Sequence, residues 1–148
     1  MQSNTFAEIV KGWIDQSFRT SPAFVRHRRQ DGEFEASVRA PRGSKAGHLV
    51  VFTYRGDLWV RFSPPNMCYS VDSRGELVSI VRQLLSERAL FIACYRDGAW
   101  SGTTLVRRGT VPKVKRGEVA HVVSWTGQYD ETIGFPTSDG KRSTVAPA

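Results

Sequence analysis

The spacing of the hydrophobic residues switches between a helical period and a strand period, and this feature constrains the fold most. Residues 6–18 and 77–85 carry apolar side chains at helical spacing, whereas residues 34–40 alternate between apolar and polar side chains. Such alternation is typical of a strand with one buried face. The sequence therefore predicts helices at intervals among strands, which is the pattern of an α+β domain.

Both predicted helices begin with a capping box. Thr5 and Glu8 stand at the start of the first helix, and Ser73 and Glu76 stand at the start of the second. In this pattern the two side chains satisfy backbone N–H groups of the first turn, so they mark where a helix begins. The apolar faces consist of Phe6, Ile9, Val10, Trp13, Ile14 and Phe18 in the first helix and of Leu77, Ile80, Val81, Leu84 and Leu85 in the second.

Turn residues divide the rest of the chain into strands. Before the second helix, glycine-containing turns at 30–32 and 55–57 predict two hairpins, and Pro64-Pro65 begins a longer connection. After it, residues 89–95 are apolar almost without interruption, so this strand is expected to be central and covered on both faces. The predicted strands are a segment from Phe24, 34–40, 49–54, 58–62, 89–95, 100–107 and 118–126.

These elements predict an α+β fold in which an antiparallel β-sheet of about six or seven strands is packed by two amphipathic helices. Residues 1–133 are expected to form a single domain, because 148 residues are too few for two cores of ordinary size. Residues 134–148 consist mainly of Gly, Pro, Ser, Thr and charged residues. With so little to bury, they are predicted to be a disordered tail.

Several classes of protein are disfavoured by the sequence. The longest apolar run, residues 89–95, is far shorter than the roughly 18 residues of a membrane span, and residues 1–10 lack the features of a signal peptide. Two cysteines, Cys68 and Cys94, are too few for a disulfide scaffold and are expected to be unbridged thiols. We therefore expect a cytoplasmic protein that has no membrane partner.

No arrangement of residues predicts catalysis, a cofactor or a metal. The histidines and cysteines lack the short spacings of zinc sites, and no phosphate-binding loop or nucleophile elbow is present. His121 alternates with valines and is expected to pack in a sheet, and Asp130-Glu131 is typical of a solvated loop. A small enzyme built on His121 or on this carboxylate pair remains a third, less favoured hypothesis.

The net charge of +7, from 21 basic and 14 acidic residues, favours acidic partners such as nucleic acid or an acidic protein. The same charge could instead serve only solubility. Two basic clusters lie in segments 26–29 and 107–116, and the second is expected to form a loop between strands that could hold phosphates. The candidate binding residues are Arg26, Arg28, Arg29, Arg107, Arg108, Lys113, Lys115 and Arg116.

Nucleic-acid binding is the second hypothesis rather than the first. Exposed aromatic residues near the basic loop could stack on bases. However, Trp13, Trp59 and Trp125 fall on apolar stripes, where core packing explains them without a ligand. The sequence also contains no RNA-recognition, KH or helix-turn-helix pattern.

Segments 56–60, 89–93, 97–102 and 123–127 combine hydrophobic strands with turns that contain Trp and Gly. Through these segments the second half of the chain resembles small bacterial α+β proteins of uncharacterised or immunity type. The resemblance implies a non-catalytic protein that presents a compact sheet to a cognate toxin, and no functional residue can be transferred from it. The basic charge departs from the acidic character of nuclease inhibitors. The leading prediction is a binding protein for another macromolecule, most readily a protein.

Overall fold

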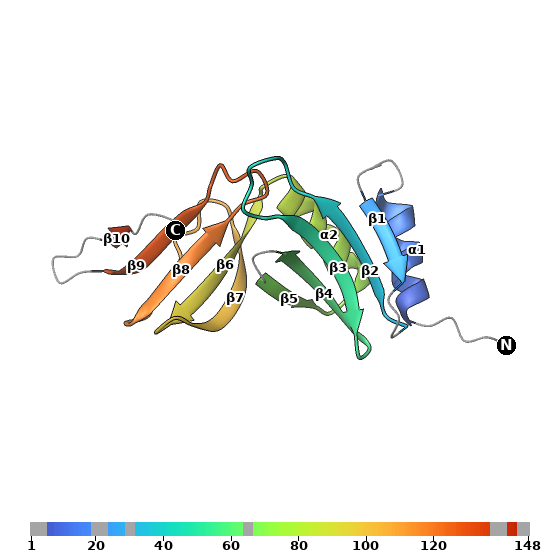
Figure 1. Cartoon of the computed structure of the whole chain (residues 1–148), viewed down its shortest axis with the longest axis horizontal. Helices are drawn as coiled ribbons and strands as arrows, with labels where there is room; N and C mark the ends of the chain where they lie inside the picture. The colour runs from blue at the N-terminus through green and yellow to red at the C-terminus, as the bar shows by residue number, and fades with distance from the viewer. Residues whose placement is uncertain (1–5, 19–23, 29–31, 64–66, 137–141, 145–148) are drawn as a thin grey trace.

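The computed structural model describes residues 6–18, 24–28, 32–63, 67–136 and 142–144. These residues form two α-helices and ten strands, and every paired strand is antiparallel, so the predicted α+β class is confirmed. The strands form two five-stranded sheets that lie side by side instead of one sheet of six or seven strands (Figure 1).

The first sheet follows the order of the chain, and its last strand, residues 67–71, lies where the sequence predicted a longer connection instead of a strand. At the tip of the third and fourth strands, Arg55 and Gly56 both have positive φ, of 50° and 82°. Two such residues form the turn type whose twist matches a hairpin, so the hairpin predicted at 55–57 is confirmed. The strands are β1 (Phe24–Arg28), β2 (Phe34–Arg39), β3 (His48–Tyr54), β4 (Asp57–Ser63) and β5 (Met67–Val71).

The second sheet contains two strands that the sequence did not predict. Gly134 to Pro136 belong to β9, and residues 142–144 pair with that strand as β10, so the predicted boundary at 134 falls inside the sheet. The pairing needs only backbone groups, which explains why a segment with few apolar side chains joins the sheet. The order is β10-β9-β8-β6-β7, formed by β6 (Ala89–Arg96), β7 (Ala99–Arg107), β8 (Glu118–Val123), β9 (Glu131–Pro136) and β10 (Arg142–Thr144).

Helix α2 (Arg74–Leu85) connects the two sheets, and its start confirms the predicted capping box. The Ser73 hydroxyl accepts a hydrogen bond from the Glu76 N–H at 3.1 Å, while the Glu76 carboxylate accepts one from the Asp72 N–H at 3.1 Å. Two backbone donors at the exposed end of the helix are thereby satisfied. The other helix, α1 (Phe6–Phe18), buries Val10 and Ile14.

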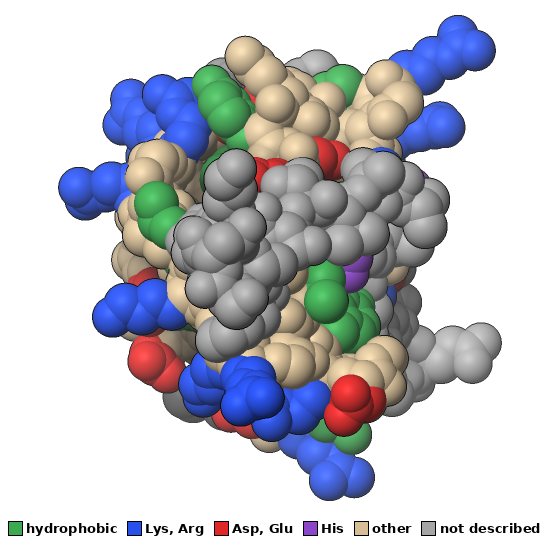
Figure 2. Space-filling model, turned by 90° about the vertical axis from the view of Figure 1, so that its left-hand side faces the viewer, with side chains coloured by type: hydrophobic (Ala, Val, Ile, Leu, Met, Phe, Trp, Pro, Cys, Tyr) green, Lys and Arg blue, Asp and Glu red, His purple; other side chains and the backbone are tan. Residues whose placement is uncertain are grey.

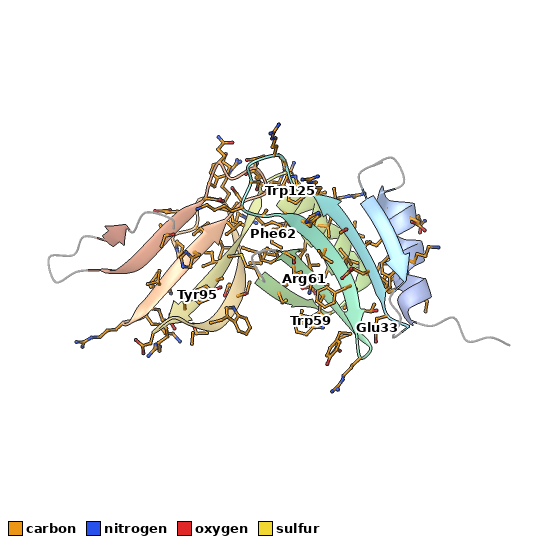
Figure 3. The ribbon with its side chains drawn as sticks, in the orientation of Figure 1. Glu33, Trp59, Arg61, Phe62, Tyr95 and Trp125 are labelled. Carbon is orange, nitrogen blue, oxygen red and sulfur yellow. The ribbon has the colours of Figure 1, made fainter. Side chains whose placement is uncertain are left out.

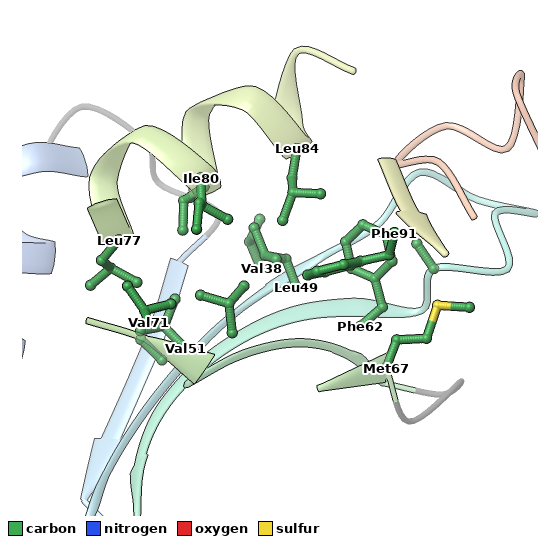
Figure 4. Close-up of a cluster of buried hydrophobic side chains, with 14 of the residues drawn as sticks. Val38, Leu49, Val51, Phe62, Met67, Val71, Leu77, Ile80, Leu84 and Phe91 are labelled. Atoms are coloured by element: carbon green, nitrogen blue, oxygen red, sulfur yellow. The ribbon is translucent and has the colours of Figure 1, made fainter. Parts of the chain in front are cut away.

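The main core lies between the two helices and the face of the first sheet that they cover. Leu77, Ile80 and Leu84 of α2 pack with side chains of β2 and β3 in this cluster (Figure 4). Phe91 of β6 joins it through an edge-to-face contact with Phe62 of β4, at 5.0 Å between ring centroids. The two sheets therefore share one hydrophobic core, with the helices on one side of the first sheet as predicted.

A second, smaller core covers the other face of the second sheet. Leu90, Ile92, Ala120, Val122 and Ile133 are buried there, and Val114 of the connection between β7 and β8 packs on them. Strand β6 is thus buried on both faces, as its continuous apolar sequence predicted.

Candidate functional site

The first predicted basic cluster lies at the edge of the first sheet. Arg26 and Arg28 are in β1, which is the terminal strand of that sheet, and the structure describes their backbone only. Arg29 lies outside the described residues. Binding by this cluster therefore stays a prediction.

The second predicted cluster is divided between the two ends of the second sheet. Arg107 pairs with Ala89 at one end of β6, whereas Lys115 and Arg116 precede Glu118, which pairs with Arg96 at the other end. Along an eight-residue strand these ends lie roughly 23 Å apart. From the side of the molecule that carries β9 and β10, the visible Lys and Arg side chains form several separate groups around the margin (Figure 2). The 107–116 segment therefore does not form one compact basic loop.

Arg107 and Arg108 instead join two arginines of the preceding helix and turn. Arg82 and Arg88 line the same open groove of about 770 Å³, and none of the described residues that line it is Asp or Glu. The remaining lining residues are Gly75, Val78, Ser79 and Gln83, all from α2. We call this surface the arginine groove.

Backbone hydrogen bonds hold the parts of the arginine groove together. The Arg88 N–H donates to the Gln83 carbonyl at 2.9 Å, which folds the chain back after α2, and the Arg108 N–H donates to the Arg88 carbonyl at 2.8 Å. The Arg108 guanidinium also lies 5.0 Å from the centre of the Tyr129 ring and donates to the Tyr129 hydroxyl at 3.0 Å. The groove is thus built on a helix end and a strand end whose backbones are directly bonded.

Arg82 and Arg88 were missed because neither belongs to a run of basic residues: Arg82 stands alone within the second helix, and Arg88 stands alone after it. The sequence did contain the information needed to find them. A hairpin with its turn at Asp97-Gly98 returns the chain beside its own start, so residue 107 must lie near residue 89. The arginines that flank α2 are brought to the same place.

The residues proposed for catalysis have structural partners. His121 Nδ1 lies 3.1 Å from the Thr132 hydroxyl, and its ring meets Tyr95 edge to face. The Asp130 carboxylate accepts hydrogen bonds from the Ser124 N–H at 2.7 Å and the Ser124 hydroxyl at 3.1 Å, so it braces the turn between β8 and β9. Glu131 is exposed in β9. The structure does not bring the two carboxylates together as an acid–base pair.

Both cysteines are free thiols, as predicted. Burial raises the pKa of Cys68, an effect that Arg61 partly opposes, and burial also raises the pKa of Cys94, where Glu118 adds to it. A raised pKa keeps a thiol protonated and makes it a poor nucleophile near neutral pH. In the described part of the chain, no three His, Cys, Asp or Glu side chains are grouped as metal ligands, and no helix could span a membrane.

Comparison with known proteins gives no relative: no protein family, no curated protein and no solved structure matches this chain. The resemblance of the second half to immunity proteins therefore stays a prediction.

Proposed function

We propose that this protein is a non-catalytic binding protein that recognises another macromolecule, and that the arginine groove is its binding surface. The observation that carries this proposal is the meeting of Arg82, Arg88, Arg107 and Arg108 in one groove without a carboxylate among its lining residues. Each guanidinium has five N–H donors in a planar fork that matches a carboxylate or a phosphate. Such a groove attracts an acidic surface.

An acidic protein surface is the partner that the lining favours. Ser79 and Gln83 add neutral hydrogen-bonding groups and Val78 adds an apolar contact between the arginines. Arginine itself is enriched at protein interfaces and among the residues that contribute most to their binding energy. Among the described lining residues none is aromatic, whereas sites for single-stranded nucleic acid use aromatic rings to stack on bases.

Nucleic acid is the second candidate, supported by the residues of the 107–116 segment. Arg107 and Arg108 line the groove, and Lys113, Lys115 and Arg116 are exposed farther along the same connection. A nucleic acid long enough to follow this connection would contact both ends of the second sheet. Its binding would then depend on both sets of charges.

Two triple variants that remove the same charge test the proposal. R82Q/R88Q/R107Q removes three groove arginines, and K113Q/K115Q/R116Q is the matched control. With an oligoglutamate peptide as a probe of an acidic protein surface, we expect the groove variant to bind at least about tenfold more weakly than the control. Fluorescence anisotropy at about 50 mM and 200 mM salt measures both affinities and their salt dependence.

The same titration with a DNA duplex of equal charge separates the two candidates. Preference for the duplex by more than about 100-fold, with both triple variants weakened alike, would support nucleic-acid binding. Equal and small losses in both variants with both probes would mean that only net charge matters, and this would overturn the proposal. Circular dichroism of each variant checks that the fold is retained.

A further inference from the structure

An aromatic cleft lies between the two sheets, at the end opposite the arginine groove. The cleft has a volume of about 500 Å³. Tyr95 of the second sheet faces it from one side, and Trp59 and Arg61 of the first sheet face it from the other (Figure 3). The full lining is Phe52, Tyr54, Trp59, Arg61, Cys68, Tyr95 and Trp100.

The first wall of the cleft is the face of the first sheet that the helices leave uncovered. Phe52 and Trp59 are direct cross-strand partners on β3 and β4, and their rings are nearly parallel, with an interplanar angle of 13° and centroids 6.3 Å apart. The Arg61 guanidinium lies over Phe52 at 4.7 Å, and its Nη2 atom is 3.5 Å from the Glu35 carboxylate. The ring and the carboxylate fix the position of this cation.

The second wall depends on an irregularity in the β6–β7 hairpin. Cys94 pairs with Gly102 but Tyr95 pairs with Trp100, so one extra residue of β7, Ser101, is inserted at this point. Side chains alternate along a strand, and the insertion turns Trp100 to the same face as Tyr95. Trp100 is 55% exposed, and its indole N–H donates to the Thr103 hydroxyl at 3.1 Å. The bulge thereby gives the cleft an accessible aromatic side.

The cleft also contains donors that lack acceptors. The indole N–H of Trp59 and the Nε–H of Arg61 are buried without a hydrogen-bond partner anywhere in the described ranges. Such orphaned groups are costly and uncommon, and a small rotation of either side chain toward a bound acceptor would satisfy them. Arg61 is the one charged residue among the seven that line the cleft. The cleft therefore offers aromatic faces, two donors without acceptors and the Arg61 guanidinium, whose charge is shared with Glu35.

We propose that this cleft binds a free small molecule that combines a planar aromatic ring with a carboxylate. The ring would lie among Trp59, Tyr95 and Trp100, and the carboxylate would accept hydrogen bonds from Arg61. The volume lies within the range of about 300–1,000 Å³ typical of small-molecule sites, and a guanidinium is well suited to a carboxylate. No residue is shared with the arginine groove, so this proposal does not depend on the proposed macromolecular function.

Calorimetric titration with 2-naphthoate tests the proposal, and 2-naphthamide is the uncharged comparison ligand. We expect saturable 1:1 binding of 2-naphthoate to the full chain and about tenfold weaker binding of the amide. R61Q is expected to weaken binding of the carboxylate about tenfold and to leave binding of the amide unchanged. R55Q is the matched control, because Arg55 lies over the neighbouring Tyr54 at 5.4 Å but does not line the cleft.

The W100A variant tests the aromatic wall on an exposed side chain, where loss of the fold is not expected. We expect it to weaken binding of both ligands alike. Absence of saturable 2-naphthoate binding would overturn the proposal, as would equal affinity for the amide and the carboxylate. The comparison of the two ligands on the unaltered protein decides the matter even if R61Q fails to fold. Neither result bears on oligoglutamate or DNA binding, so failure here is distinct from failure of the proposed function.

Discussion

The two sheets have the same number of strands but differ in how their faces are covered. In β4 of the first sheet, buried residues alternate with half-exposed ones, and the half-exposed face forms a wall of the aromatic cleft. In β6 of the second sheet, five consecutive residues from Ala89 to Ala93 are buried, because hydrophobic clusters cover both faces. The alternation in β4 thus leaves one face of that strand available to the cleft, whereas residues 89–93 of β6 have no uncovered face.

The largest expected effect is on the free energy of unfolding, and it differs between the two faces of β6. Phe91 is fully buried in the main core, where its ring contacts Phe62 and Tyr69, whereas Ile92 faces the smaller cluster that Val114 helps to cover. We expect Phe91→Ala to lower the free energy of unfolding by about 4 kcal/mol and Ile92→Ala by about 2 kcal/mol. The smaller loss is expected because a loop side chain can move into the space left behind. Urea denaturation measures both values.

Equal losses at the two positions would contradict this comparison. They would mean that the connection between β7 and β8 is as rigid a cover as helix α2. A larger loss for Ile92→Ala than for Phe91→Ala would show that the second cluster, and not the shared core, dominates stability.

A smaller effect is expected from buried hydroxyls in the two sheets. Thr53, fully buried in the first sheet, accepts a hydrogen bond from the Phe34 N–H at 2.9 Å. Thr53→Val leaves that donor without a partner, so we expect a loss of about 1–3 kcal/mol. In the second sheet, the Thr132 hydroxyl contacts the half-buried His121, whose ring can bind water instead. Thr132→Val is therefore expected to cost less than about 1 kcal/mol. Thermal unfolding of both variants checks that Thr53→Val lowers stability more than Thr132→Val does. A larger loss for Thr132→Val would contradict this prediction.

The elements predicted well from sequence are those whose cause is local. Helix α2 carries its own cap and apolar stripe, and the 55–57 turn carries its own glycine, so neither depends on distant residues. The division into two sheets is not local, because it depends on which strands pair with one another. Leu84 of α2 and Ile92 of β6 are both buried but lie in different clusters, because Ile92 points to the face of β6 opposite Phe91.

The two candidate binding surfaces likewise depend on contacts that the sequence alone does not reveal. Arg107 and Arg108 were found as a charged run, but their partners Arg82 and Arg88 become visible only through the strand register. Trp59 was assigned to the core because it lies in an apolar strand. It lines the cleft instead, because its neighbours Leu58 and Val60 point to the helices. Alternation gives two faces but does not say which one is covered.

The smallest expected effect compares one thiol from each sheet. Burial raises the pKa of both Cys68 and Cys94, but the strongest charge effects act in opposite directions: Arg61 lowers the pKa of Cys68, whereas Glu118 raises that of Cys94 against a smaller opposite effect of Lys115. Because the thiolate is the reactive form, we expect R61Q to slow alkylation of Cys68 and E118Q to accelerate that of Cys94. Iodoacetamide labelling at about pH 8.5, followed by peptide mass spectrometry, measures the two rates separately.

The pH dependence of these thiols has a definite sign. A raised pKa means that the folded chain holds the thiol proton more tightly than the unfolded chain does. Each thiol therefore favours the folded state fully below the unfolded pKa, and this contribution is lost as the pH rises through the raised, folded value. We expect a slight fall in thermal stability in that alkaline range, and C68A/C94A is expected to reduce this fall.

The alkylation rates of R61Q and E118Q decide between charge and access as the cause of the difference between the thiols. If both variants changed the two rates in the same direction, local electrostatics would not control the thiols, and the two sheets would differ only in how accessible their thiols are.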